Sequence, residues 1–193
     1  RHYSIELIAP LDFLKRYNKA AGPFASMSFC CIPRAVLRKI GSEPFSMKVS
    51  GADDYYFFNV LPLLGPMVYC PVPLVAYRIT DEAHSANRLI SVGLAVNAFE
   101  LLDKRYRDLQ EVKLLKTFTI AFSSKRRHYA KILMGEGQTS EARKQLQRSL
   151  INTNNPVSLA KSIVLLFLTY MPSQLQPKWA SSYRELKSPD HVS

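Results

Sequence analysis

Asp53 and Asp54 are adjacent carboxylates that stand directly before a run of aromatic and aliphatic residues. The run continues as Tyr55-Tyr56-Phe57-Phe58, which should enter a hydrophobic core. Acidic side chains in such a place can begin a helix, because negative charge interacts well with the helix N-terminus. They can also act as a general base or a metal ligand at the mouth of a cleft. On these residues alone both interpretations stay open.

The bulk composition is typical of a globular chain whose second half is basic. The chain has 193 residues, of which 47% are hydrophobic and 21% charged, enough for one or two units with a core. Residues 1–100 carry 10 basic and 8 acidic side chains, whereas residues 101–193 carry 16 and 7. A basic half suits nucleic acid, an anionic membrane surface or an acidic partner, and it also serves solubility.

Three cysteines, Cys30, Cys31 and Cys70, lie in apolar stretches. Their spacing forms neither a zinc pattern nor a disulfide framework, so it predicts buried, reduced thiols and a cytoplasmic protein. No signal peptide is visible at the start, and no apolar run reaches the ~18–20 residues of a membrane span.

The first ninety residues mix short helices with short strands. Pro33 should open a helix, and Pro62 should kink the helix that begins at the acid pair or end it early, near Leu61. The predicted helices are 11–17, 34–40 and 53–64, and the predicted strands are 27–32, 67–70 and 74–79.

The rest of the chain has helical periodicity only. Helices are predicted over 89–106, 109–134, 140–150 and 157–171. A set of small and aliphatic residues has the spacing of one tetratricopeptide-like hairpin: Ala130, Leu133, Gly137, Ala142, Leu146 and Ser149. The predicted fold class is therefore α+β, with a mixed sheet and flanking helices in residues 1–90 and an all-α region in residues 91–193.

Residues 24–90 resemble the second, acceptor-side half of bacterial family 2 glycosyltransferases, which have the GT-A fold. The resemblance rests on the order and spacing of Phe29-Cys30-Cys31-Ile32-Pro33-Arg34, Ile40-Gly41, Ala52-Asp53-Asp54-Tyr55, Gly65, Val68-Tyr69, Pro73-Leu74-Val75-Ala76-Tyr77-Arg78-Ile79 and His84-Ser85. It implies transfer of a sugar from a nucleotide-sugar donor to a glycan or lipid-linked acceptor, in cell-envelope glycan or polysaccharide synthesis.

In this resemblance Asp54 falls on the general base, which takes the proton of the acceptor hydroxyl. Asp53, Tyr55 and Arg78 would bind the acceptor or support the base. A divalent cation, Mg²⁺ or Mn²⁺, is implied, with His84 as the candidate ligand. The alternative is that His84 is an ordinary loop histidine.

The family's nucleotide-binding half has no counterpart here. Neither a Gly-rich phosphate loop nor an Asp-x-Asp motif occurs in the 193 residues. We therefore expect the chain to be a fragment of a longer transferase and to be inactive by itself.

Two features of the helical region suggest binding. Leu159, Ile163, Leu166, Phe167 and Tyr170 form an apolar face with Lys161, which suits attachment to the inner surface of a membrane or packing on the preceding hairpin. The basic residues Lys125, Arg126, Arg127, His128, Lys131, Arg143, Lys144 and Arg148 could meet phosphates, or form a solvated helix face. Aromatic residues are not interleaved with them, so nucleic acid is not expected. The remaining alternative is a non-catalytic helical interaction module.

Overall fold

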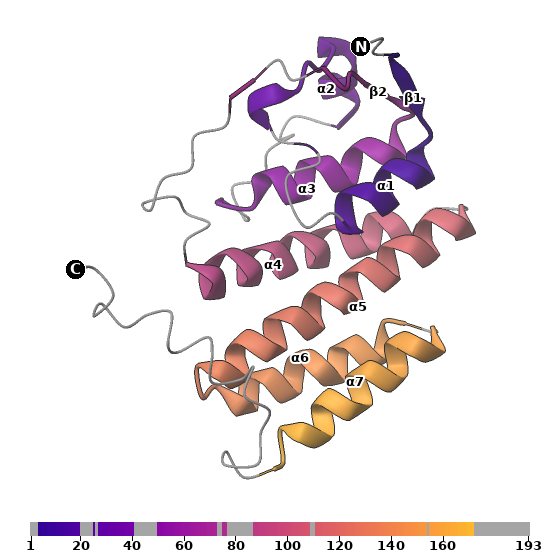
Figure 1. Ribbon diagram of the computed structural model, residues 1–193. Helices are drawn as coiled ribbons and strands as arrows, with labels where there is room; N and C mark the ends of the chain where they lie inside the picture. Colours follow the sequence, from indigo (N-terminus) through magenta and orange to yellow (C-terminus); the bar gives the residue numbers. More distant parts are fainter. Residues whose placement is uncertain are drawn as a thin grey trace, which may run out of the picture. The chain divides into compact units, whose positions relative to one another are not determined.

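The computed structural model describes residues 4–19, 25, 27–40, 50–72, 75–76, 87–108, 111–153 and 155–171. Within them the fold is α+β and mostly helical (Figure 1). The elements are β1 (Glu6–Ile8), α1 (Pro10–Lys19), α2 (Arg34–Ile40), α3 (Asp53–Val60), β2 (Met67–Tyr69), α4 (Arg88–Arg107), α5 (Val112–Gly135), α6 (Thr139–Ile151) and α7 (Pro156–Leu168), with 3-10 helices at Met27–Phe29 and Leu61–Leu63.

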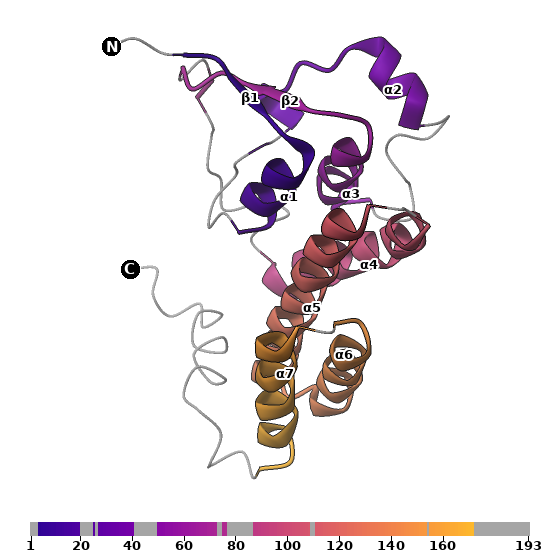
Figure 2. The same ribbon diagram turned by 90° about the vertical axis from the view of Figure 1, so that its right-hand side faces the viewer.

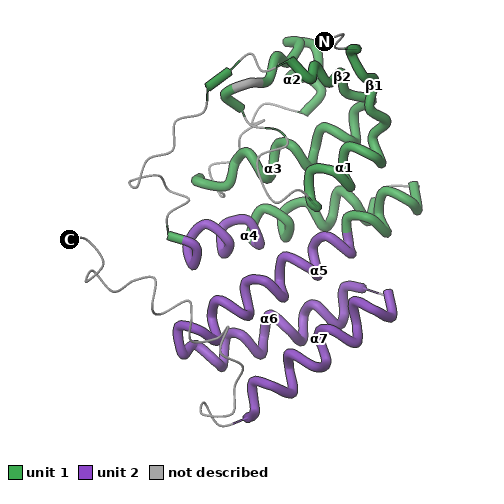
Figure 3. Tube along the Cα trace, viewed as in Figure 1, with its two compact units in different colours: residues 1–87, 97–118 green, residues 88–96, 119–193 purple. Residues whose placement is uncertain are grey.

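Two compact units make up the chain (Figure 3). Unit 1 comprises residues 1–87 and 97–118, and unit 2 comprises residues 88–96 and 119–193. The helices α4 and α5 therefore contribute residues to both units. The division after residue 90, expected from the change in sequence pattern, stays a prediction.

Unit 1 contains a two-stranded antiparallel sheet in which β1 lies beside β2 (Figure 2). Ile8 enters the core with 2% of its surface exposed. Leu7 and Val68 pair directly across the sheet, and each is 69% exposed. Because side chains alternate along a strand, the sheet has one covered face and one open apolar face.

The helix α3 forms the centre of unit 1. Phe57 and Phe58 are 0% and 1% exposed, and the ring centroid of Phe58 lies 5.3 Å from that of Tyr17 in α1. Asn59 is also fully buried; its Nδ2 donates to the Tyr55 carbonyl at 2.8 Å, and its Oδ1 accepts from Asn18 Nδ2 at 2.9 Å. An amide in a core needs such partners, so these bonds fix α3 against α1.

Tyr106 of α4 holds the other side of α3. Its hydroxyl donates to the Asn59 carbonyl at 2.7 Å. Its ring stacks on Phe118 of α5, with centroids 3.9 Å apart and planes inclined by 6°. The side chain is completely buried, so it combines apolar packing with a satisfied hydroxyl.

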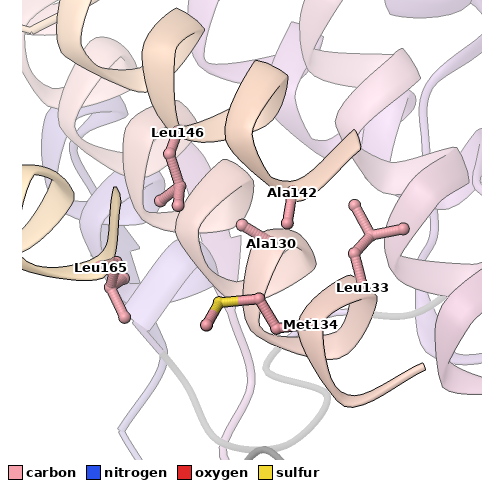
Figure 4. Close-up of a cluster of buried hydrophobic side chains, with 6 residues drawn as sticks. All are labelled: Ala130, Leu133, Met134, Ala142, Leu146 and Leu165. Carbon is pink, nitrogen blue, oxygen red and sulfur yellow. The ribbon is translucent and has the colours of Figure 1, made fainter. Parts of the chain in front are cut away.

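Unit 2 is built on the antiparallel pair α5 and α6, followed by α7. The turn between α5 and α6 has Gly137 at φ 77°, a conformation that favours glycine. Buried apolar side chains from the three helices meet in one cluster (Figure 4): Ala130, Leu133, Met134, Ala142, Leu146 and Leu165. Four of the residues that predicted a helical hairpin, Ala130, Leu133, Ala142 and Leu146, therefore form its core.

A polar network lies beside this cluster. Arg127 is 9% exposed, and its Nη1 donates to the Ser158 hydroxyl at 2.6 Å and to the Ser162 hydroxyl at 3.3 Å. Ser162 in turn shares a 2.6 Å hydrogen bond with Ser149 of α6. The interior of unit 2 is consequently polar in part where α7 meets α5 and α6.

Most helices predicted from periodicity are confirmed, with ends displaced by a few residues. Pro62 ends α3 as expected, since α3 stops at Val60 and a 3-10 helix follows. The predicted strand at 27–32 is wrong, because Met27–Phe29 is a 3-10 helix. An apolar run becomes a strand only beside another strand, and within the described residues the sheet holds only β1 and β2.

Two further predictions for the first ninety residues, a mixed sheet and buried cysteines, differ from the structure. The described sheet is antiparallel, not mixed. The cysteines are free thiols, but Cys31 and Cys70 are exposed and Cys30 is half-buried. Within the strand predicted at 74–79, Val75 and Ala76 have no regular structure, and the other positions lie outside the described residues.

Replacement of Tyr106 by phenylalanine tests the contact with α3. Tyr106→Phe keeps the ring but removes the donor to the buried Asn59 carbonyl, so we expect the free energy of unfolding to fall by about 1 kcal/mol. Urea unfolding followed by circular dichroism measures this. The matched control is Tyr129→Phe, which changes a half-buried tyrosine of α5 and should alter the free energy of unfolding little. An equal loss of stability in Tyr106→Phe and Tyr129→Phe would contradict the role assigned to the Tyr106 hydroxyl.

Candidate functional site

The acid pair lies at the first turn of α3, where the helix emerges from the core. Ala52, directly before the helix, is 1% exposed, and every residue from Tyr56 to Val60 is buried. Asp53 and Asp54 are half-buried between these two apolar positions. The helix therefore holds both carboxylates at the edge of the core, with part of each side chain open to solvent.

Both carboxylates accept backbone hydrogen bonds at the helix start. Asp53 Oδ1 accepts from the Gly51 N–H at 3.2 Å, and Asp54 Oδ1 accepts from the Tyr55 N–H at 2.7 Å. The Tyr55 N–H lies in the first turn of α3, where N–H groups have no partner within the helix, whereas Gly51 precedes the helix. The predicted helix start at Asp53 is confirmed.

Aromatic rings border the acid pair. The ring of Tyr55 lies 5.9 Å from that of Tyr17, centroid to centroid, with planes inclined by 60°. Tyr17 also stacks on Phe13, one turn earlier in α1, with centroids 5.9 Å apart. Through these contacts α1 supplies one wall of the site and α3 supplies the carboxylates.

Tyr17 was not anticipated from the sequence. Burial raises the pKa of its phenol far above the ordinary value, and the nearby carboxylate of Asp54 raises it further. Tyr17 therefore stays protonated at neutral pH, as a neutral donor within electrostatic range of Asp54. No local pattern links it to a residue 37 positions later, because the packing of α1 on α3 brings the two together.

Two of the predicted site residues lie outside the described residues. These are Arg78 and His84, the candidate acceptor contact and the candidate metal ligand. Within the part of the chain that the structure describes, no three His, Cys, Asp or Glu side chains are grouped as metal ligands. Of the residues assigned to the site, Asp53, Asp54 and Tyr55 are brought together, and the cation site stays a prediction.

The basic residues of the helical region, for which a solvated helix face was expected, do not form a continuous charged surface. Arg126 and Arg127 are buried, at 4% and 9% exposure. Arg126 Nη1 donates to Gln145 Oε1 at 2.8 Å, and its guanidinium lies 4.3 Å from the centroid of the Phe122 ring. These two arginines therefore serve packing in unit 2, and the expectation of a wholly solvated face is wrong for them.

Comparison of the chain with protein-family profiles, with curated proteins and with solved structures gave no match. Among the described helices, none has the length and apolarity to cross a bilayer.

The environment of Tyr17 predicts a pH dependence of stability. A tyrosine whose pKa is raised in the folded state holds its proton when the unfolded chain has lost it, so stability is retained below pH ~10 and falls above it. Tyr17→Phe should make this fall shallower by about 1.4 kcal/mol per pH unit. Urea unfolding between pH 8 and 11 measures the slope, with Tyr170→Phe as the exposed control. Identical slopes for wild type and Tyr17→Phe would show that the phenol ionises freely in the folded protein.

Proposed function

We propose that this chain is the acceptor-side half of an inverting family 2 glycosyltransferase, with Asp54 as the general base. The observation that carries the proposal is the position of Asp54. Its carboxylate is held at the half-buried start of a helix whose residues from Tyr56 onward are buried, and Asn59 ties that helix to two neighbouring helices. A base must be held this firmly, because orientation toward the acceptor lowers the entropic barrier.

In the proposed reaction Asp54 accepts the proton of an acceptor hydroxyl as that oxygen attacks the anomeric carbon of the donor. The bond from the anomeric carbon to the diphosphate oxygen breaks, and the nucleoside diphosphate leaves with inversion at the sugar. A bound divalent cation would stabilise the charge of the leaving diphosphate. Asp53 positions the turn that carries Asp54, through its bond to Gly51.

The aromatic border of the site supports a sugar-like acceptor. The rings of Tyr55 and Tyr17 lie beside the carboxylates. Binding sites combine such apolar surfaces with a few fixed polar groups, and the apolar faces of a sugar ring pack well on aromatic rings. This arrangement favours a glycan or the sugar head of a lipid-linked glycan as acceptor.

The open face of the sheet supports a transferase with a further half. Leu7 and Val68 are each 69% exposed on a sheet with two described strands, and Ile5, directly before β1, is 72% exposed. Two strands are rarely stable alone, and an exposed apolar sheet face marks a place where other structure packs. A donor-binding half of a GT-A fold would cover such a face.

The decisive experiment is the Asp54→Asn substitution in the polypeptide that contains both halves of the transferase. We expect sugar transfer to fall by about 10²- to 10⁴-fold, because the amide cannot take the hydroxyl proton. Transfer is measured with labelled nucleotide sugars and envelope glycan acceptors, and folding is followed by thermal melting.

The matched control is Asp12→Asn, which removes an exposed carboxylate of α1 that pairs with Lys15 at 3.6 Å. This variant should retain full transfer. If Asp54→Asn retained full transfer as well, the acid pair would be a helix start only. That result would favour the alternative, a non-catalytic helical module.

A further inference from the structure

The buried side of the helix α7 includes polar residues, and its exposed side is largely apolar. Its side toward α5 and α6 carries Ser158, Ser162 and Leu165, which are 3%, 0% and 8% exposed. Thr169, directly after the helix, is 2% exposed and receives hydrogen bonds from Arg143. Surface helices normally bury their apolar side and expose their polar side.

The opposite side of α7, here called the outward face, is apolar and exposed. It consists of Val157, Ala160, Lys161, Ile163, Val164, Phe167 and Tyr170. The large apolar members are between 57% and 68% exposed. Only Leu159 and Leu166 of the predicted apolar face are half-buried, so packing on the hairpin does not account for the rest. Contiguous exposed apolar surface of this kind marks an interaction site.

The charge around the outward face identifies its partner. The helix Pro156–Leu168 contains no acidic residue, and its one charge is Lys161. Across the described residues of unit 2, nine Lys and Arg stand against two Glu, and seven of the nine remain when the buried Arg126 and Arg127 are set aside. The guanidinium of Arg143 lies 4.0 Å from the centroid of the Tyr170 ring, which places a cation at the rim of the apolar surface. An apolar face with a basic border is complementary to lipid chains beneath anionic headgroups.

We propose that the outward face of α7 docks this protein on the surface of an anionic lipid bilayer. The helix lies in the plane of the interface, with Val164 and Phe167 inserted among the acyl chains and Lys161 at the headgroups. Its 13 residues are too few to cross a bilayer but sufficient for an interfacial helix. A second copy of the chain is a poorer occupant, because pairing two outward faces would bring like charges together.

The test is co-sedimentation of the full-length protein with vesicles of phosphatidylcholine, with or without 30% phosphatidylglycerol. We expect binding to the anionic vesicles that weakens at high salt. The double variant Val164→Ser/Phe167→Ser should lower the partition coefficient for anionic vesicles at least tenfold. Lys161→Gln should lower it about fivefold, which is the effect of one basic residue near an anionic surface. Ile90→Ser/Val112→Ser is the matched control, which removes two exposed apolar side chains from α4 and α5 and should bind as wild type.

Three outcomes would overturn the proposal. The first is equal binding of the α7 variant and the wild type. The second is that the protein does not bind vesicles but forms a dimer in ultracentrifugation, and that the α7 substitutions dissociate this dimer. That result would assign the outward face to a second copy of the chain. The third is no vesicle binding and a lower melting temperature in the α7 variant, which would show that the chain itself covers the face. All binding is measured without donor or acceptor, so the result is independent of the transferase proposal.

Discussion

The buried amide of Asn59 is the interaction on which unit 1 depends. It joins α3 to α1 through Asn18, while the carbonyl of the same residue accepts the Tyr106 hydroxyl of α4. A polar side chain at 0% exposure is costly unless its hydrogen bonds are made, so these three helices can meet in only one register. The position of the carboxylates at the start of α3 follows from that register.

A comparable constraint governs unit 2, where Arg127 is buried and, within the described residues, no carboxylate is among its hydrogen-bond partners. The hydroxyls of Ser158 and Ser162 surround its guanidinium instead, and burial lowers the pKa of the arginine without removing its charge at neutral pH. These serines share the inner side of α7 with Leu165, while Ile163, Val164 and Phe167 lie on its exposed side. The buried network and the exposed apolar residues therefore occupy different sides of one helix.

The helices could be predicted because their signals are local. Pro33 and Pro62 fix where α2 begins and α3 ends, and the spacing of Ala130 and Leu146 predicts the helical hairpin. The strand predicted at 27–32 failed for the opposite reason. Whether an apolar run pairs with a neighbouring strand depends on residues far away in the chain, and in this structure β1 pairs with β2 instead.

The candidate sites show the same difference between features set by neighbouring residues and features set by distant contacts. By itself the sequence determined that two carboxylates open a helix and that the last helix carries an apolar stripe, because both are patterns of neighbouring residues. Only the tertiary structure decided that Tyr17 borders the acid pair, that Arg126 and Arg127 are buried, and that the stripe on α7 faces outward. These facts depend on which side of each helix is packed, and that choice is made by contacts between segments distant in sequence.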